Sequence, residues 1–365
     1  MIEIKTSQGR ISRDDDGFSL VEMLVSIVIF LIVTGAIWSV LSVARQSSTT
    51  VNRSVELSKT VRVGMNLLGR DTYNAGFGYP FTTTVWLPDN RVSALLGIPN
   101  DSDTTRDTVP PIIAGNNITL NSFNATPNVK TDQVTFFFKD STFNRIGPTE
   151  DEKISTPISI NIAAAPTGTG IDEIVPLSGS NDMCGLNDIY MIAGGTGAMV
   201  GMATKLIDGA DGHPDTVQFA NNDKLKFNLT GPTGPMSTLT LPASLYRIKI
   251  VTYFVTADGT LTRREYGNYG TATAPNGYVD EPLVYGVENF QIKYVMEDGA
   301  LSDNPSAGGN GTPGDGDDDA ARLMAVRQVR FIIDARSIEP GPDGSFARTS
   351  MTSIFSTRNL GYDAN

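Results

Sequence analysis

One carboxylate stands at the start of the most apolar stretch of the chain. Glu22 is followed by an uncharged, largely apolar run over residues 23–44. A charged side chain inside a bilayer costs roughly 2.5–3.5 kcal/mol even on lenient scales, so such a residue usually faces a partner rather than lipid. The placement of Glu22 therefore indicates that its side chain has a partner, and this makes Glu22 the strongest candidate for a functional residue.

Three other features could do chemistry, but none forms a convincing site. His213 is the only histidine, so neither a histidine-based zinc site nor a catalytic triad is predicted. Cys184 is the only cysteine, so no intramolecular disulfide can form, and we expect a small buried hydrophobe there. The glycine-rich run 194–201 lacks the Gly-Lys-Ser/Thr ending of a phosphate-binding loop, so a turn between two strands is expected.

A cluster of carboxylates offers the oxygen ligands that Ca²⁺ accepts. Asp315, Asp317 and Asp319 lack the regular spacing and the distal glutamate of an EF-hand loop. They lie in a Gly-, Asp- and Pro-rich segment, about 302–320, which is typical of a solvated flexible insertion. We expect no cofactor, with Ca²⁺ at this cluster as the weaker alternative; residues 101–107 are a weaker candidate still.

Composition and charge exclude some functions. The 365 residues include 40 Asp and Glu against 28 Lys and Arg, a net charge of −12. An acidic surface repels phosphate backbones, so no nucleic-acid partner is expected. The absence of a second histidine and of a nucleophile elbow counts against hydrolysis, and we expect no enzymatic activity.

The apolar run predicts the first structural element. Residues 18–43 form a helix of about 39 Å, enough to cross ~30 Å of hydrocarbon. Apolar residues then recur at helical spacing, which extends the predicted helix as an amphipathic segment to about Tyr73. These residues are Val51, Val55, Val61, Met65 and Leu68. Gly76, Gly78 and Pro80 are expected to end the helix, and the polar run 47–50 is its weakest part.

The remainder predicts short strands and turns. Strands are expected at 133–138, 158–162, 188–192, 225–229, 246–255, 260–266, 287–296 and 326–333, with a hairpin turn at 257–259. The predicted fold class is therefore α+β, in which a long N-terminal helix, first transmembrane and then amphipathic, packs on an antiparallel β-sheet domain.

The segment GFSLVEMLV, residues 17–25, resembles the processing site of type IV prepilins and type II secretion pseudopilins. The resemblance implies cleavage after Gly17, N-methylation of the new N-terminal Phe18, and pairing of Glu22 with an N-terminal amine during filament assembly. The leader, residues 1–17, departs from the family because three aspartates at 14–16 stand where prepilins more often carry Lys or Arg.

Later motifs resemble large minor pilins of the W type and their relatives, the J-type minor pseudopilins of type II secretion. They are LLGRD (67–71), AGFGY (75–79), TDQVT (131–135), NDIYMI (187–192), LTRREY (261–266), LVYGVENFQIKY (283–294) and VRQVRF (326–331). The match is good at both ends of the chain and loose over 80–240.

The resemblance implies a pilin-like protein that takes part in assembling a type IV pilus. Its domains would be a leader (1–17), a transmembrane helix (18–44), an amphipathic continuation (45–75) and a β-rich domain (76–365). Its partners would be prepilin peptidase, other minor pilins, the major pilin, the inner-membrane assembly platform and membrane lipid. It would cross the inner membrane once, with the β-rich domain outside the cytoplasm, and enter the extracellular pilus.

Two alternatives stay open. Within the same family, the chain would be a J-type minor pseudopilin of a type II secretion system. From another class, it would be a membrane-anchored surface binding protein or a hydrolase whose site the sequence does not reveal.

Overall fold

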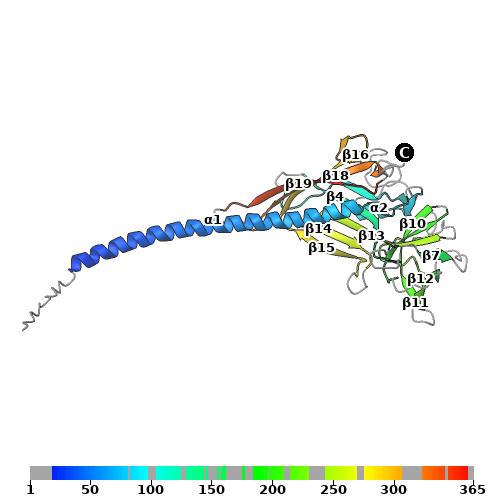
Figure 1. Ribbon diagram of the computed structural model, residues 1–365, viewed down its shortest axis with the longest axis horizontal. Helices are drawn as coiled ribbons and strands as arrows, with labels where there is room; N and C mark the ends of the chain where they lie inside the picture. The colour runs from blue at the N-terminus through cyan, green and yellow to red at the C-terminus, as the bar shows by residue number, and fades with distance from the viewer. Residues whose placement is uncertain are drawn as a thin grey trace, which may run out of the picture.

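One helix of 55 residues, α1 (Leu20–Asn74), forms the long axis of the molecule, and its C-terminal half enters a β-rich domain (Figure 1). At ~1.5 Å per residue it is about 80 Å long. The computed structural model describes residues 19–80, 83–97, 104–124, 129–143, 145–146, 154–155, 158–161, 175–176, 184–195, 197–208, 214–229, 243–268, 275–305, 323–341 and 344–360.

The helix ends at Asn74, one residue beyond the predicted end at Tyr73, and the glycines that follow it end it as predicted. Gly76 and Gly78 adopt φ of +77° and +71°, a left-handed conformation that glycine reaches without steric cost. The polar run 47–50 does not interrupt the helix. The hydroxyls of Thr49 and Thr50 donate to the carbonyl oxygens of Arg45 and Gln46, one turn earlier, at 2.6 and 3.0 Å.

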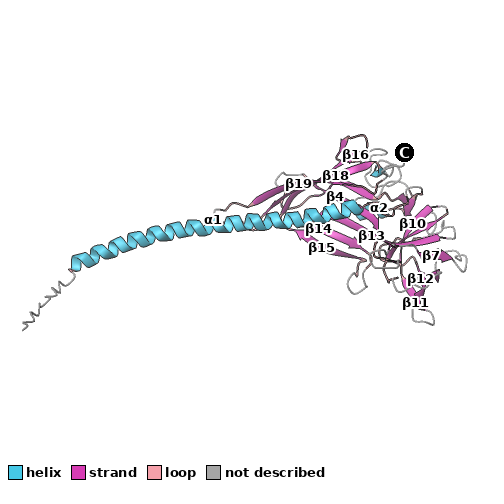
Figure 2. Cartoon of the chain, viewed as in Figure 1, coloured by secondary structure: helices cyan, strands magenta, loops and turns pink. Residues whose placement is uncertain are grey.

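Strands make up nearly all of the regular structure after α1 (Figure 2). The strands are β1 (Val85–Leu87), β2 (Asp107–Thr108), β3 (Ile112–Thr119), β4 (Thr131–Lys139), β5 (Arg145–Ile146), β6 (Ile154–Ser155), β7 (Ile158–Asn161), β8 (Val175–Pro176), β9 (Ile189–Gly194), β10 (Gly197–Met202), β11 (Lys205–Asp208), β12 (Pro214–Gln218), β13 (Ala243–Val255), β14 (Leu261–Tyr266), β15 (Tyr278–Val284), β16 (Val287–Met296), β17 (Leu301–Ser302), β18 (Val326–Arg336) and β19 (Arg348–Ser356). A short helix, α2 (Arg91–Leu96), follows β1.

The long strand β13 organises the larger, 11-stranded sheet. Its C-terminal part pairs with β14 and β4, and its N-terminal part pairs with β9 and β7, all antiparallel. The pair formed by β1 and β10 is parallel. The arrangement is thus a long apolar helix followed by a largely antiparallel β-sheet domain, and the predicted α+β class is confirmed.

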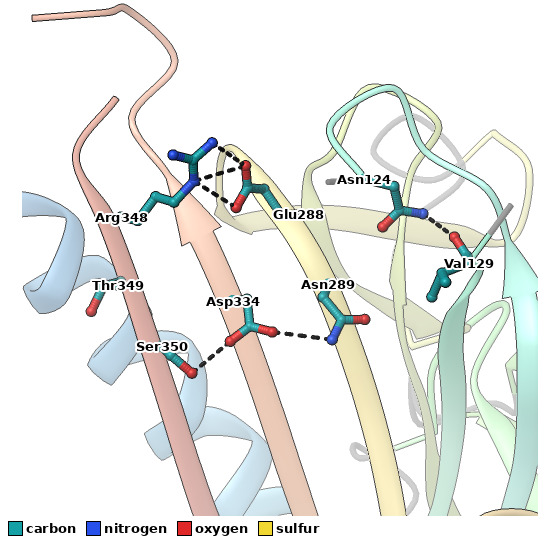
Figure 3. A pocket seen from close by; sticks show the side chains of 8 residues that line it. All are labelled: Asn124, Val129, Glu288, Asn289, Asp334, Arg348, Thr349 and Ser350. Atoms are coloured by element: carbon teal, nitrogen blue, oxygen red, sulfur yellow. Dashed lines mark hydrogen bonds and ion pairs between the residues drawn. The ribbon is translucent and has the colours of Figure 1, made fainter. Parts of the chain in front are cut away.

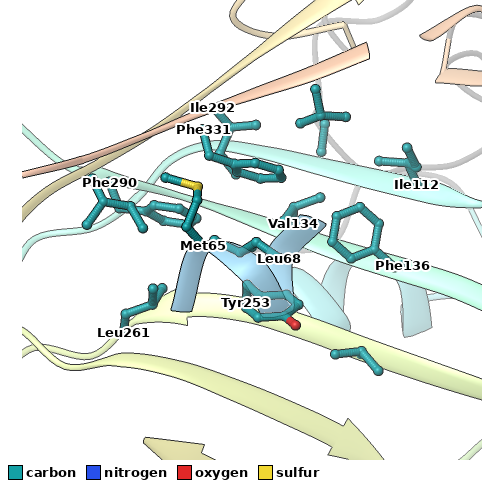
Figure 4. Close-up of a cluster of buried hydrophobic side chains, with 14 of the residues drawn as sticks. Met65, Leu68, Ile112, Val134, Phe136, Tyr253, Leu261, Phe290, Ile292 and Phe331 are labelled. Atoms are coloured by element: carbon teal, nitrogen blue, oxygen red, sulfur yellow. The ribbon is translucent and has the colours of Figure 1, made fainter. Parts of the chain in front are cut away.

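The main core lies between the two large sheets, and α1 contributes to it directly. The second sheet has the order β17-β16-β18-β19, and α1 packs mainly against its edge strand β19 and against β15 of the larger sheet. Met65 and Leu68 point from the helix into a cluster with Phe290 and Phe331 of the smaller sheet and Tyr253 of the larger one (Figure 4). The helix therefore belongs to the core of the domain.

The strand predicted at 225–229 is wrong. Lys226 has φ of +60°, and the Asp223 carboxylate accepts hydrogen bonds from the backbone N–H groups of Phe227 at 2.8 Å and Asn228 at 3.1 Å. A side chain thus satisfies donors that a strand would offer to a neighbour. Phe227 is buried, so its apolar character indicated core position rather than strand geometry.

The predicted buried face of the helix begins later than expected. Val61 is fully buried, whereas Val51 and Val55 are 56% and 47% exposed. The β-rich domain contacts the helix at Arg53, which donates to the Pro340 carbonyl oxygen at 2.6 Å, and again at Ser58, whose hydroxyl lies 3.4 Å from that of Thr349 at the start of β19. Both contacts leave the side chains of Val51 and Val55 largely uncovered.

Two further regions can be compared with expectation. In the glycine-rich run 194–201 the expected connection between two strands is present, because Gly194 ends β9 and faces Gly197 at the start of β10, and Gly197 to Gly201 belong to β10. A Cβ at Gly197 would lie 2.3 Å from the Trp86 ring, so a larger residue would not fit without movement. In the predicted insertion 302–320, Ser302 pairs with Tyr294, and residues 306–320 lie outside the described residues.

Candidate functional site

The start of α1 carries the candidate assembly residue. Ser19 is the N-cap, and its hydroxyl accepts from the backbone N–H of Glu22 at 3.2 Å, while the Glu22 carboxylate accepts from the backbone N–H of Ser19 at 3.0 Å. This reciprocal pair is a capping box, which satisfies two backbone donors that the first helical turn leaves free. Gly17 and Phe18, the predicted cleavage and methylation residues, lie outside the described residues.

The helix that follows Glu22 is uncovered along its apolar part. The large hydrophobic side chains from Leu20 to Val43 are all exposed, the least exposed of them being Leu41 at 40%. The segment is long and apolar enough to span a membrane, and it lies near the N-terminus. A surface of this extent in a single chain needs lipid or other helices to cover it.

Two glycines let the other half of α1 approach the sheets closely. A Cβ at Gly64 would lie 2.8 Å from the Val284 side chain, and a Cβ at Gly69 would lie 2.4 Å from the Phe355 ring. Both glycines are in regular helix, where glycine costs up to about 1 kcal/mol relative to alanine. Close packing on β15 and β19 therefore offsets a local cost.

A buried ion cluster fixes the last turns of α1. Asp71 is 1% exposed, and its carboxylate accepts from the Arg263 guanidinium at 3.0 Å, the Tyr253 hydroxyl at 2.7 Å and the Arg70 guanidinium at 3.1 Å. Arg263 also donates to Glu265 at 2.9 Å. Burial acts to lower the pKa of Arg263, but Asp71, Tyr253 and Glu265 together outweigh it and raise that pKa. The cluster joins the helix to β13 and β14.

A polar pocket of about 440 Å³ lies on the outer face of the smaller sheet (Figure 3). Arg348 donates to both oxygens of the Glu288 carboxylate at 3.2 Å, and Asp334 accepts from the Asn289 amide at 3.1 Å. Ser350 also donates to Asp334. Both carboxylates thus accept hydrogen bonds from side chains of β16 and β19. The pocket therefore presents a hydrogen-bonded sheet surface and no acid and base free for catalysis.

Cys184 is buried, as expected, and it sits beside a polar group. Burial raises the pKa of the Cys184 thiol. Asp188 accepts from the Tyr190 hydroxyl at 3.1 Å, from the backbone N–H of Gly185 at 2.9 Å and from Arg247 at 3.2 Å. Burial also raises the pKa of Asp188, against the opposing charge of Arg247. These contacts hold the 184–190 loop onto β13.

The candidate metal ligands are not brought together in the part of the chain that is described. There, no group of three His, Cys, Asp or Glu side chains could hold a metal ion. Asp315, Asp317, Asp319 and His213 lie outside the described residues. Asp107 instead accepts from the backbone N–H of Val92 at 3.0 Å, at the start of α2.

Comparison with known proteins identifies the N-terminal segment. Residues 12–38 match the family model of the prokaryotic N-terminal methylation motif. No curated protein matches the chain. The motif and the apolar helix α1 fit a membrane-anchored, prepilin-like protein of a type IV pilus or type II secretion system. The motif implies processing by prepilin peptidase and association with other pilins.

The sequence singled out Glu22, whose role in assembly stays a prediction, but it did not indicate the Asp71 cluster. Asp71 and Arg263 both stand in segments that resemble W-type minor pilins, yet nothing in either segment indicates that they pair. The available signal was an aspartate within the apolar face of a helix, since a buried carboxylate requires a cation or several donors.

Proposed function

We propose that this protein is a minor pilin of the W type, which takes part in assembling a type IV pilus. It acts as a structural and assembly subunit rather than as an enzyme, and the role requires no cofactor. Prepilin peptidase cuts after Gly17, Phe18 is methylated, and the mature chain is held in the inner membrane by α1 with its β-rich domain outside the cytoplasm. It then joins other minor pilins and the major pilin at the inner-membrane assembly platform and enters the extracellular filament.

The observation that carries this proposal is the methylation motif at the start of an uncovered apolar helix. In a helix that only anchored the chain, Glu22 would contribute no more than the capping box with Ser19. In low dielectric, removing one partner of a buried ion pair costs roughly 3–5 kcal/mol. An N-terminal ammonium of a neighbouring subunit would meet Glu22 in that setting, so the pair would favour correctly aligned helices.

The capping box offers a competing role for Glu22, and a set of substitutions separates the two. Glu22→Gln keeps a side chain that can close the box but removes the charge. Ser19→Ala removes the hydroxyl of the box but keeps the charge. If Glu22 pairs with an amine, Glu22→Gln and Glu22→Ala should both deplete the subunit from sheared surface filaments, while Ser19→Ala should leave it there.

The readout is peptide mapping of sheared filaments and of the inner-membrane fraction from the same cells. Processed protein should be detected in the inner-membrane fraction for all three variants, because none of the substitutions adds charge to the helix. Glu22→Asp, with its shorter reach, should be intermediate. Glu22→Gln present in filaments at the wild-type level would refute the ion-pair role, and the wild-type chain missing from filaments would refute the pilin role.

A J-type minor pseudopilin of type II secretion is the second candidate, because the same motif precedes both kinds of subunit. Deletion of the gene separates them. Loss of surface pili with normal protein secretion supports the pilus, whereas loss of secretion with normal piliation supports the pseudopilin.

A further inference from the structure

A basic cleft lies beside the C-terminal end of α1. It has a volume of about 450 Å³ and is lined from α1, β4, β13, β14 and the segment after β19. Its lining carries five cations and three carboxylates, an excess of two positive charges in a chain whose net charge is −12. The cations are Arg70, Lys139, Lys249, Arg263 and Arg358, and the carboxylates are Asp71, Asp140 and Glu265.

The three carboxylates are already engaged within the protein. Asp71 and Glu265 both accept hydrogen bonds from Arg263, whose side chain is only 9% exposed. Asp140 accepts from Thr142 and from Arg247, at 2.9 Å in each case. Burial acts to raise the pKa of Asp140, but these donors outweigh it and hold that pKa below its usual value. Asp71 also accepts from Arg70 at 3.1 Å, and Glu265 lies 3.6 Å from the Lys249 ammonium, so the acids offset part of the positive charge and the lining keeps its excess of two.

The rim cations remain accessible to a ligand. The side chain of Arg70 is 58% exposed, and that of Lys249 is 33% exposed and 3.6 Å from Glu265. The Lys139 ammonium lies 5.1 Å from the centre of the Tyr246 ring, and burial lowers its pKa. Arg358 is exposed and makes no ion pair with any residue that the structure describes.

One wall of the cleft is apolar. Phe77 contributes to the lining and is 42% exposed, and Phe138 lies beneath it with little exposure. Cations around an aromatic wall are complementary to a ligand peptide in which a carboxylate side chain stands next to an apolar residue in sequence. An acidic peptide with an apolar side chain would match both the cations and the aromatic wall.

We propose that this basic cleft binds an acidic segment of a neighbouring filament subunit, an inference that rests on the proposed function. Asp71 lies 27 residues beyond Ala44, about 40 Å along the helix at ~1.5 Å per residue, so lipid headgroups do not reach the cleft. A nucleic acid needs a basic track along its backbone, whereas this group of five basic residues lines one short cleft on an acidic protein. A protein carboxylate cluster fits both the size and the charge.

The test uses the full chain in nonionic detergent and a fluorescent pentaglutamate peptide, with binding followed by anisotropy at low and high salt. Arg358→Glu should weaken binding by about fivefold, and adding Lys139→Gln by about tenfold or more, since each exposed ion pair contributes up to ~1 kcal/mol. Lys205→Glu is the matched control, because Lys205 is exposed on β11 and does not line the cleft. It should bind as the wild type does.

Thermal unfolding of each variant checks that the domain is intact. Binding that is lost in Arg358→Glu, kept in Lys205→Glu and weakened by salt supports the proposal. No binding by the wild type, or equal loss in the control, overturns it. Tighter binding of a six-nucleotide DNA strand, which has five phosphodiester charges, would also overturn it and assign the cleft to nucleic acid. The purified chain needs no filament for this test, so its outcome is separate from that of the Glu22 experiment.

Discussion

Asp71 and Arg263 are 192 positions apart in the chain, and the Arg263 guanidinium donates to the Asp71 carboxylate at 3.0 Å with both side chains buried. The pair connects the helix that carries the membrane anchor to strand β14. Force or displacement applied to the helix is therefore transmitted to the β-rich domain through this pair and through the apolar contacts of Met65 and Leu68.

Asp71→Ala should destabilise the folded domain by about 3–5 kcal/mol, because it leaves the buried Arg263 charge with weaker compensation. Urea unfolding in detergent, followed by near-ultraviolet circular dichroism, measures the loss. Arg53→Gln is the control, since the Arg53 to Glu339 pair is at the surface and 3.7 Å long. That change should cost less than ~1 kcal/mol. Equal effects of the two substitutions would show that the Asp71 cluster contributes no more than a surface pair.

Gly69→Ala should destabilise the domain by about 1–3 kcal/mol although alanine favours helix, because its Cβ would meet the Phe355 ring at 2.4 Å. The ring packs 6.0 Å from Phe331, so it has little room to move. In the background of Phe355→Ala, the same glycine substitution should become neutral or stabilising. Asn66→Ala, on the exposed helix face, should change stability by less than ~0.5 kcal/mol. A stabilising effect of Gly69→Ala alone would contradict the close helix contact.

Asp132 should make stability depend on pH. Burial raises its pKa from 3.8 to about 6, although the backbone N–H groups of Asn117 and Ile292 donate to it. Between about pH 4 and pH 6 the folded state then holds a proton that the unfolded state has released. Stability should therefore fall as pH rises through this window, by about 3 kcal/mol from this group.

The effect of Asp132 is measured as a difference, because other groups titrate in the same range. Unfolding of the wild type and of Asp132→Asn should be compared from pH 3.5 to 7.5 under the same conditions. The wild type should lose stability relative to the variant as pH rises from about 4 to 6. A constant difference across the range would show that Asp132 titrates normally.

Cys184 should react slowly with iodoacetamide in the folded protein at pH 8, because burial both shields the thiol and raises its pKa. Unfolding in urea should restore the rate of a free cysteine, which provides the internal control. Mass spectrometry of the labelled peptide gives both rates. Rapid labelling of the native chain would mean that the 184–190 loop opens readily.

The sequence indicated the elements that obey local rules. The long helix, its glycine end, the hairpin at 257–259 and strands β16 and β18 follow from periodicity and turn chemistry. The strand prediction at 225–229 was wrong because the apolar residues there, including the buried Phe227, resemble the pattern of a strand. The turn is formed by hydrogen bonds to Asp223, which depend on the conformation of the backbone. The Asp71 cluster and the basic cleft combine segments far apart in the chain, and pairing over such distances is not encoded in any local pattern.

The most direct test of the central claim is mass spectrometry of the N-terminal peptide from sheared filaments and from the inner membrane. The proposed function predicts a mature chain in both fractions that begins at Phe18 and carries one added methyl group. It also predicts that peptides from residues 1–17 are missing from the filaments. A chain that still begins at Met1, that is cut after Ala44, or that never leaves the membrane would contradict the assignment as a filament subunit.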